Sequence, residues 1–446
     1  MLKPALLLTA LLIAAIPARA QSSNDAVTSF ELGNGMDVVV IEDHRAPAVT
    51  QMVWYKAGSA DEKSGVSGVA HFLEHLMFKG TKETKPGEFS AIVARHGGRE
   101  NAFTSYDHTA FFQRVPVDQL ETVMRLEADR MTNLQLSEKD VLTERDVIIE
   151  ERNMRVENSP ESLFTEQANA AQYLNHPYGR PVIGWQNEMS RLTRQDALDF
   201  YRTYYAPNDA VLVVAGDVIP KDVRRLAEKY YGVLPANPDL PKRVRPQEPR
   251  QMAERRVIFE DPRVGQPYVS RSYLAPERDS GAQKRAAALT ILADLLGGGQ
   301  SSVLTGALQF ERKIAVQTGA SYNGLMLDDT TFDVYVVPAP GVTLDQAEAA
   351  LDDVLAAFLQ NGVDPAQLAR VKLQIKADQI YARDSVFRLA QRYGSALTKG
   401  LTIEDVQAWP DILQAVTAED VMTAARDLFD RKKSVTGILK APEVTQ

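Results

Sequence analysis

Two histidines and one glutamate stand close enough in the sequence to bind and use a metal ion. His71, Glu74 and His75 form the pattern H-x-x-E-H inside a segment from Ser64 to Gly80, which we predict as a helix with a serine cap and a terminal glycine. At about 100° per residue, the three side chains project from one helix face. Two imidazoles one turn apart can chelate one zinc ion, and the neighbouring carboxylate can serve as a general base. The pentapeptide alone also fits an exposed helix that carries two histidines near a glutamate without any metal.

The composition limits the ligands that such a site can use. The 446 residues include no cysteine and six histidines, so imidazole and carboxylate groups would have to form any metal site. So few histidines favour one strong site over a secreted zinc-storage protein with several sites. The net charge of −9 argues against a general nucleic-acid-binding role.

A third metal ligand is expected on a second rigid element, and it should be a carboxylate. Residues 137–155 are predicted as a long helix, in which Glu144 and Glu151 are seven positions apart and share a face. The two glutamates flank Val147 and Ile148, which we expect on the inward side of this helix. The residues alone leave both glutamates as candidates. They also leave the simpler interpretation of a solvated helix with ion pairs between successive turns.

A proline-rich segment divides the chain into two halves with the same order of elements. Residues 236–249 hold four prolines and predict a linker between domains at 21–235 and 250–446. Because the element order recurs, we predict an α+β fold that arose by duplication of one domain of roughly 200 residues. Chance similarity between two α+β halves is the alternative. The strand, helix and capped long helix are predicted at 107–116, 118–131 and 137–155 in the first half, and at 329–338, 344–360 and 364–383 in the second.

The first twenty residues are typical of a secretory signal peptide. A basic start precedes an apolar run at residues 5–16, and residues 17–20 end in a small-x-small cleavage pattern. An uncleaved anchor helix is the alternative, although the run is short for a membrane span. Cleavage would remove Lys3 and Arg19 and leave a chain of charge −11. We therefore predict a periplasmic protein without stable membrane insertion.

Five stretches of the sequence match one family of enzymes. They are residues 68–81 (GVAHFLEHLMFKGT), 101–104 (NAFT), 144–151 (ERDVIIEE), 176–181 (HPYGRP) and, in the second half, 295–304 (LLGGGQSSVL). Together they resemble the pitrilysin/insulinase (M16) family of zinc metallopeptidases, and within it the short bacterial forms similar to the catalytic subunit of the mitochondrial processing peptidase. The resemblance extends over nearly the whole chain after the signal peptide.

The resemblance implies a role for each candidate residue of the metal site. The family pairs H-x-x-E-H with a glutamate 76 residues after the second histidine, which is the position of Glu151. His71, His75 and Glu151 would hold one Zn²⁺ per chain, and Glu74 would be the general base of a zinc metalloendopeptidase. Glu144 would orient a ligand histidine or hold Glu151 in place, with a surface ion pair as its alternative role.

The resemblance also implies a fold and a mode of substrate binding. Each half would be a largely antiparallel sheet packed with helices, and the two homologous domains would form half of a clam-shell chamber. An extended peptide would add to an edge strand through backbone hydrogen bonds. The contacts in that strand would come from Asn101, Ala102 and Phe103.

One departure from the family concerns the second half. It contains no H-x-x-E-H, so we expect it to be non-catalytic. Family members that cleave alone carry an arginine and a tyrosine seven residues apart in this half, where the chain has Gln309 and Val316. Arg312 and Tyr322 lie nearby but with the wrong spacing. The resemblance therefore implies a heterodimer with a related subunit that supplies the Arg/Tyr pair, with a homodimer as the alternative.

These expectations combine into one predicted function. The chain would be a periplasmic zinc endopeptidase that cleaves peptides or unfolded segments inside a two-subunit chamber. The alternative is a catalytically silent subunit that forms a chamber or binds peptides in a related complex.

Overall fold

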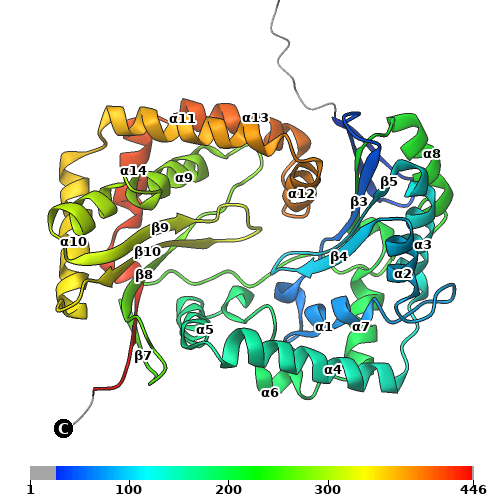
Figure 1. Cartoon of the computed structure of the whole chain (residues 1–446), viewed down its shortest axis with the longest axis horizontal. Helices are drawn as coiled ribbons and strands as arrows, with labels where there is room; N and C mark the ends of the chain where they lie inside the picture. Colours follow the sequence, from blue (N-terminus) through cyan, green and yellow to red (C-terminus); the bar gives the residue numbers. More distant parts are fainter. Residues whose placement is uncertain (1–26, 444–446) are drawn as a thin grey trace, which may run out of the picture.

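The structure is a computed structural model that describes residues 27–443 (Figure 1). The signal peptide predicted at residues 1–20 lies outside the described residues. Two β-sheets organise the described chain, and helices pack around both of them. The predicted α+β fold with two sheet-and-helix units is thereby confirmed. No helix within residues 27–443 is long and apolar enough to span a membrane.

The first sheet lies in the N-terminal half and has six strands in the order β1-β2-β6-β3-β5-β4. β2 and β6 run parallel, and every other neighbouring pair is antiparallel. β6 reads AVLVVAG and is buried along its whole length, as expected for a strand covered on both faces. The strands are β1 (Val27–Glu31), β2 (Asp37–Glu42), β3 (Ala48–Tyr55), β4 (Arg99–Thr104), β5 (Thr109–Pro116) and β6 (Ala210–Gly216).

The second sheet repeats the plan of the first without its outermost strand. Its order is β7-β11-β8-β10-β9, and only β7 and β11 run parallel. In each unit the last strand runs parallel to an early one, β6 to β2 and β11 to β7. The strands are β7 (Arg255–Glu260), β8 (Tyr268–Ala275), β9 (Ala315–Tyr322), β10 (Thr330–Pro338) and β11 (Ser434–Lys440). Equal strand order and direction favour the duplication, while the domain boundaries at 21–235 and 250–446 stay a prediction.

The two long helices begin at the caps that the sequence predicts. Ser137 accepts a hydrogen bond from the backbone N–H of Asp140, and Asp364 accepts one from Ala366. The helices of the first half are α1 (Val69–Leu76), α2 (Glu88–Arg95), α3 (Leu120–Asn133), α4 (Glu138–Arg152), α5 (Pro160–Gln172), α6 (Gln186–Met189), α7 (Arg194–Tyr204) and α8 (Pro220–Tyr230). Those of the second half are α9 (Lys284–Gly297), α10 (Leu344–Asn361), α11 (Pro365–Ala382), α12 (Val386–Leu397), α13 (Ile403–Ala415) and α14 (Ala418–Leu428).

The start of α1 differs from the prediction. Ser64 is exposed and caps nothing, because the helix begins only at Val69, after Gly65 and Gly68 adopt φ of 91° and 87°. These left-handed conformations suit glycine and keep residues 64–68 in turns. The carboxylate of Glu62 accepts the N–H groups at the start of the helix instead. The serine cap was therefore wrong, because the acceptor comes from a residue that precedes the predicted segment.

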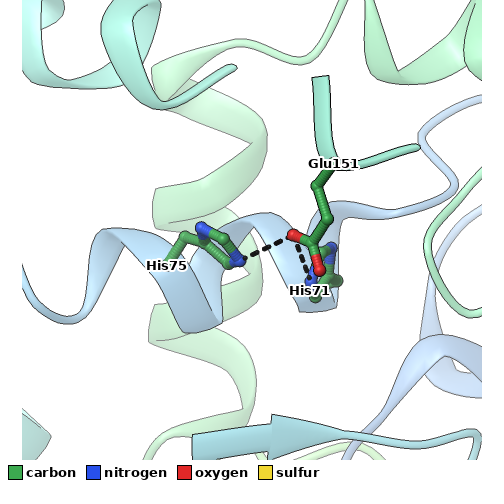
Figure 2. Close-up of side chains that lie close together, drawn as sticks. All are labelled: His71, His75 and Glu151. Atoms are coloured by element: carbon green, nitrogen blue, oxygen red, sulfur yellow. Dashed lines mark ion pairs between the residues drawn. The ribbon is translucent and has the colours of Figure 1, made fainter. Parts of the chain in front are cut away.

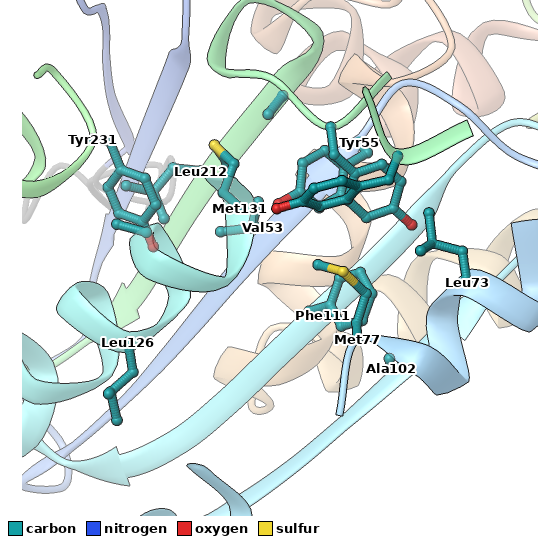
Figure 3. Close-up of a cluster of buried hydrophobic side chains, with 14 of the residues drawn as sticks. Val53, Tyr55, Leu73, Met77, Ala102, Phe111, Leu126, Met131, Leu212 and Tyr231 are labelled. Carbon is teal, nitrogen blue, oxygen red and sulfur yellow. The ribbon is translucent and has the colours of Figure 1, made fainter. Parts of the chain in front are cut away.

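A large hydrophobic core lies between the first sheet and α1, α3, α7 and α8 (Figure 3). Leu73 from α1 and Met77 directly after it pack near Tyr55 and Phe111 from the sheet. Leu73, Leu76 and Met77, which lie outside the H-x-x-E-H face, are all buried. This packing fixes which side of α1 faces the core, and it thereby sets the direction of the face that carries His71, Glu74 and His75.

Each unit also contributes one helix to the sheet of the other. α12 packs on β2, β3 and β6 of the first sheet, where Leu389 joins a cluster with Trp54. α5 packs on β7, β8 and β11 of the second sheet, where Phe164 contacts Tyr268 edge-to-face. This exchange covers the second face of both sheets and joins the two units through apolar contacts.

The proline-rich segment 236–249 forms neither helix nor strand. Its two central arginines are nevertheless fixed by ion pairs to both units. Arg243 pairs with Asp61, and Arg245 pairs with Asp61, Asp107 and Asp328. Since Arg245 is only 5% exposed, the linker is anchored at this point.

Candidate metal centre

Three potential metal ligands converge from two helices (Figure 2). His71 and His75 lie one turn apart on α1, and Glu151 lies in the last turn of α4. One carboxylate oxygen of Glu151, Oε2, is 3.6 Å from Nε2 of His71 and 3.2 Å from Nε2 of His75. Within residues 27–443 this is the one group of three or more such side chains whose ligand atoms lie within 4.8 Å of one another.

The spacing of these atoms fits a zinc ion. Ligand nitrogens and oxygens bind Zn²⁺ tetrahedrally at about 2.0–2.2 Å, which places two ligands roughly 3.3–3.6 Å apart. The separations of 3.6 and 3.2 Å lie at or close to the limits of this range. Two imidazoles and one carboxylate also make a donor set known for catalytic zinc, with a fourth position left open.

Other side chains orient two of these three candidate ligands. Nδ1 of His75 is 2.8 Å from Oε1 of Glu144, so that bond directs Nε2 toward Glu151. Lys79 pairs with the other oxygen of Glu144. Nη1 of Arg155 lies 2.7 Å from Oε1 of Glu151, which leaves Oε2 for the histidines. Glu144 therefore lies in contact with one of the candidate ligands, and its orienting role stays a prediction.

His71 lacks such an orienting partner. Its ring is buried, and within the described residues its Nδ1 has no hydrogen-bond partner. The ring of His75 touches it edge-to-face, with centroids 4.7 Å apart. The orientation of His71 therefore depends on the backbone of α1 and on the packing around the ring.

Glu74 lies between the two histidines in the sequence and is held by a strand of the sheet. Oγ1 of Thr104 in β4 donates a hydrogen bond of 2.6 Å to Oε2 of Glu74. The carboxylate is largely buried, and this burial raises its pKa although Thr104 opposes the shift. A carboxylate with a raised pKa next to a metal site is suited to accept a proton.

The histidines and Glu144 have shifted pKa values as well. Burial lowers the pKa of His71 to about 3, which keeps the ring in the neutral form that binds metals. Burial acts in the same direction on His75, but the hydrogen bond that it donates to Glu144 and the nearby carboxylates outweigh burial and raise the pKa of His75. Burial would raise the pKa of Glu144, but its bonds to His75 and Lys79 lower it.

β4 is the edge strand of the first sheet and runs beside α1. Ala102 and Thr104 face α1, whereas Phe103 contacts Trp54 on the opposite face of the sheet. Asn101 is exposed, and its side chain accepts a bond from the N–H of Ala102. The edge leaves a row of backbone groups without a neighbouring strand in the described chain, next to the metal ligands.

The other four histidines do not belong to this group of candidate ligands. His44 and His96 are exposed. His108 is buried against Trp54 and contacts Thr398 of the second half. His176 is buried and accepts a bond from the N–H of Tyr178.

In the second half, Gln309 and Val316 stand where the family has the Arg/Tyr pair, and they lie next to β9 and on it. Gln309 lies in a π-helical turn, Thr305–Glu311, and donates to Thr318, while Val316 is exposed on β9.

Sequence reasoning missed four residues around the site. Thr104 was part of the recognised NAFT stretch, but nothing in the sequence connects it with Glu74. Lys79 and Arg155 follow His75 and Glu151 by four residues, a spacing that could have indicated contact. Nothing in the sequence indicates that Glu62 contacts the start of α1. Val147, expected on the inward side of α4, is 45% exposed, so only Ile148 of that pair is buried.

Two family models match consecutive parts of the chain. One, described as Insulinase (Peptidase family M16), matches residues 37–185, and the other, described as Peptidase M16 inactive domain, matches residues 191–375. A protein of Helicobacter pylori named zinc protease PqqE is 32% identical over 429 residues, which are 94% of each chain. A probable mitochondrial-processing peptidase subunit beta of Arabidopsis thaliana is 26% identical over 418 residues, which cover 91% of this chain and 77% of that protein.

Solved structures resemble the fold over nearly its whole length. A protease from Helicobacter pylori superimposes with a TM-score of 0.86 at 30% identity and covers 93% of this chain and 100% of its own. The periplasmic protease PqqL of Escherichia coli superimposes with a TM-score of 0.81 at 22% identity. That match covers 94% of this chain but 48% of PqqL, so the present chain spans about half the length of PqqL.

Proposed function

The chain belongs to the M16 (insulinase) family of zinc peptidases, and from this premise we propose that it is a periplasmic endopeptidase. Its substrates would be peptides or unfolded segments, cleaved inside a chamber that two subunits form. The observation that carries the proposal is the group His71, His75 and Glu151, with Glu74 held beside it by Thr104. The chain would bind one Zn²⁺ through these three ligands.

Each side chain of the centre has a distinct part in the proposed hydrolysis. A zinc ion in this position would supply a Lewis acid for the scissile carbonyl and lower the pKa of a water molecule toward about 7. Glu74 takes a proton from the attacking water, while Thr104 keeps its carboxylate in place. Glu144 holds His75 in the orientation that presents Nε2. The free edge of β4 aligns an extended substrate by backbone hydrogen bonds, with Asn101, Ala102 and Phe103 in contact with it.

The experiment that tests this mechanism compares two glutamine variants. Glu74→Gln should lower cleavage of an unstructured fluorogenic peptide by about 10²–10⁴-fold, because it removes the general base. Its zinc content should equal that of the wild type, as measured by mass spectrometry of the metal. Glu150→Gln is the matched control, since Glu150 is exposed on the same helix as Glu151. Wild-type cleavage by Glu74→Gln would contradict the mechanism.

We also propose a heterodimer with a related subunit. The chain has Gln309 and Val316 where an Arg/Tyr pair would stand, and it matches half of the longer protease PqqL. A partner would supply the second half of the chamber and the missing pair. The test is the molar mass and peptidase activity of the chain alone and with related subunits. If the chain alone cleaves as fast as every reconstituted mixture, the heterodimer is wrong.

The same assay separates the enzyme from its alternative. A catalytically silent subunit that forms a chamber or binds peptides predicts no cleavage by the wild type with any partner. The cluster of His71, His75 and Glu151, with Glu74 on the same helix, favours the enzyme. The periplasmic location is tested by fractionation and by sequencing the mature N-terminus, which should begin after residue 20.

A further inference from the structure

A buried carboxylate outside the metal centre contacts the helix that carries both histidines. Glu62 is 5% exposed and follows a short 3₁₀ turn, Ser59–Asp61. Its Oε2 accepts a hydrogen bond of 3.0 Å from the N–H of Gly68, and its Oε1 accepts one of 2.9 Å from Ala70. Both oxygens therefore bind the first turn of α1, and Ala70 directly precedes His71.

This carboxylate replaces a cap that the helix itself lacks. Gly68 occupies the N-cap position and has no side chain to accept the free N–H groups. Acceptor oxygens at a helix N-terminus satisfy these donors. The first turn of α1 is thus fixed by a residue that lies six positions before the cap.

Two arginines fix the position of Glu62, Arg180 directly and Arg245 of the linker through the neighbouring Asp61. The backbone carbonyl of Glu62 accepts a bond of 3.1 Å from Arg180. The preceding residue, Asp61, accepts three hydrogen bonds from Arg245, of 2.9, 3.0 and 3.3 Å. Arg245 also pairs with Asp107 at 2.6 Å and with Asp328 of the second half at 2.9 Å. The turn that carries Glu62 is therefore tied to both halves of the molecule.

The two ligand histidines differ in what holds them. His75 is oriented by Glu144, whereas Nδ1 of His71 has no hydrogen-bond partner within the described residues. Metal-binding groups must be held to within roughly 0.5 Å of the productive geometry. For His71 this constraint falls on the backbone of the first turn of α1, which Glu62 fixes.

We propose that Glu62 is a positioning residue for the metal centre: it fixes the first turn of α1 and thereby His71, and the Asp61–Arg245 ion pair holds Glu62 in place. The proposal rests on the proposed zinc site. It assigns to the interdomain linker a part in setting metal affinity, in addition to joining the two halves.

The test measures metal binding as well as stability. Apo-protein is titrated with Zn²⁺ in competition with a chromogenic chelator, and the visible absorption spectrum of the Co²⁺-substituted protein is recorded. Glu62→Gln should weaken Zn²⁺ binding by about 10- to 100-fold, the range found for groups that orient metal ligands, and should change the Co²⁺ spectrum. Glu62→Ala should weaken it further, because no acceptor oxygen remains. Asp61→Asn should have a smaller effect in the same direction.

The matched control is Asp405→Asn. Asp405 is also buried and accepts backbone N–H bonds from Thr402 and Gly281, but it lies in the second half. This variant should lower the melting temperature and leave Zn²⁺ affinity within twofold of wild type. If the Glu62 variants lower only the melting temperature and keep wild-type affinity and spectrum, the proposal is wrong.

Two further outcomes have defined meanings. If Glu62→Ala does not fold, Glu62→Gln and Asp61→Asn decide the question, since both keep the side-chain volume. If the wild type binds no Zn²⁺, or His71→Ala binds it as tightly as the wild type, the metal centre itself is refuted. That result is distinct from a failure of Glu62 alone.

Discussion

The contact between Glu144 and His75 leads to a quantitative prediction for metal affinity. Nδ1 of His75 and Oε1 of Glu144 are 2.8 Å apart, a short bond between an imidazole and a carboxylate. Hydrogen bonds to charged groups contribute about 1.5–3 kcal/mol. If this free energy stabilises the orientation of His75 that binds metal, its loss corresponds to roughly a 10- to 150-fold increase in Kd.

Glu144→Ala removes this bond and the ion pair with Lys79. We expect its Zn²⁺ Kd, measured by chelator competition, to rise by the factor just derived. Glu144→Gln should have a smaller effect, because an amide oxygen can still accept from His75. The side chain of Glu144 is largely buried, so salt should change these ratios little.

The matched control is Glu150→Ala. Glu150 lies on the same helix but is exposed, and its contact is a bond from Asn153. Its substitution should leave the Zn²⁺ Kd within twofold of wild type. Equal affinities for Glu144→Ala and Glu150→Ala would refute the reasoning, because they would show that the bond to His75 does not orient a ligand.

Three other predictions concern stability. Gly394→Ala should destabilise the protein by about 1–3 kcal/mol in urea unfolding, because the new Cβ would lie 2.2 Å from the ring of Trp54, whereas Gly306→Ala, with open space around it, should not. Burial would raise the pKa of Asp405, but its hydrogen bonds outweigh burial and lower the pKa to about 2. The ionised side chain therefore stabilises the fold above about pH 4, and this stabilisation is lost toward pH 2. The difference in unfolding free energy between wild type and Asp405→Asn should shrink over that range. Removal of metal with a chelator should lower the melting temperature, since a ligand at 100 times its Kd adds about 2.7 kcal/mol, and His75→Ala should abolish this difference.

The local parts of the metal centre follow from sequence spacing. His71 and His75 are four residues apart, so any helix through them places both imidazoles on one face. Ser137 and Asp364 predict the starts of the long helices because a cap involves only neighbouring residues. The resemblance to a known family selected Glu151 as the proposed third ligand, which the residues alone left open between two glutamates.

Glu144 and Glu151 contact different atoms of the histidines because they lie at different positions along the axis of α4. A seven-residue spacing puts Glu144 and Glu151 on one face but about 10 Å apart along the axis. Glu144 therefore meets Nδ1 of His75, while Glu151 meets Nε2 of both histidines. Helix periodicity specifies a face, whereas the place where α4 crosses α1 depends on how both helices pack on the sheet.

The sequence by itself determined the α+β class, the paired histidines, the glutamate between them and the absence of cysteine ligands. Only the tertiary structure decided that Thr104 holds Glu74, that Glu62 caps α1 in place of Ser64, and that Arg245 is buried between the halves. The physical reason is the same in each case. These bonds join groups whose partners lie on other elements, and their formation depends on the desolvation and proximity that packing creates, which no local pattern of residues encodes.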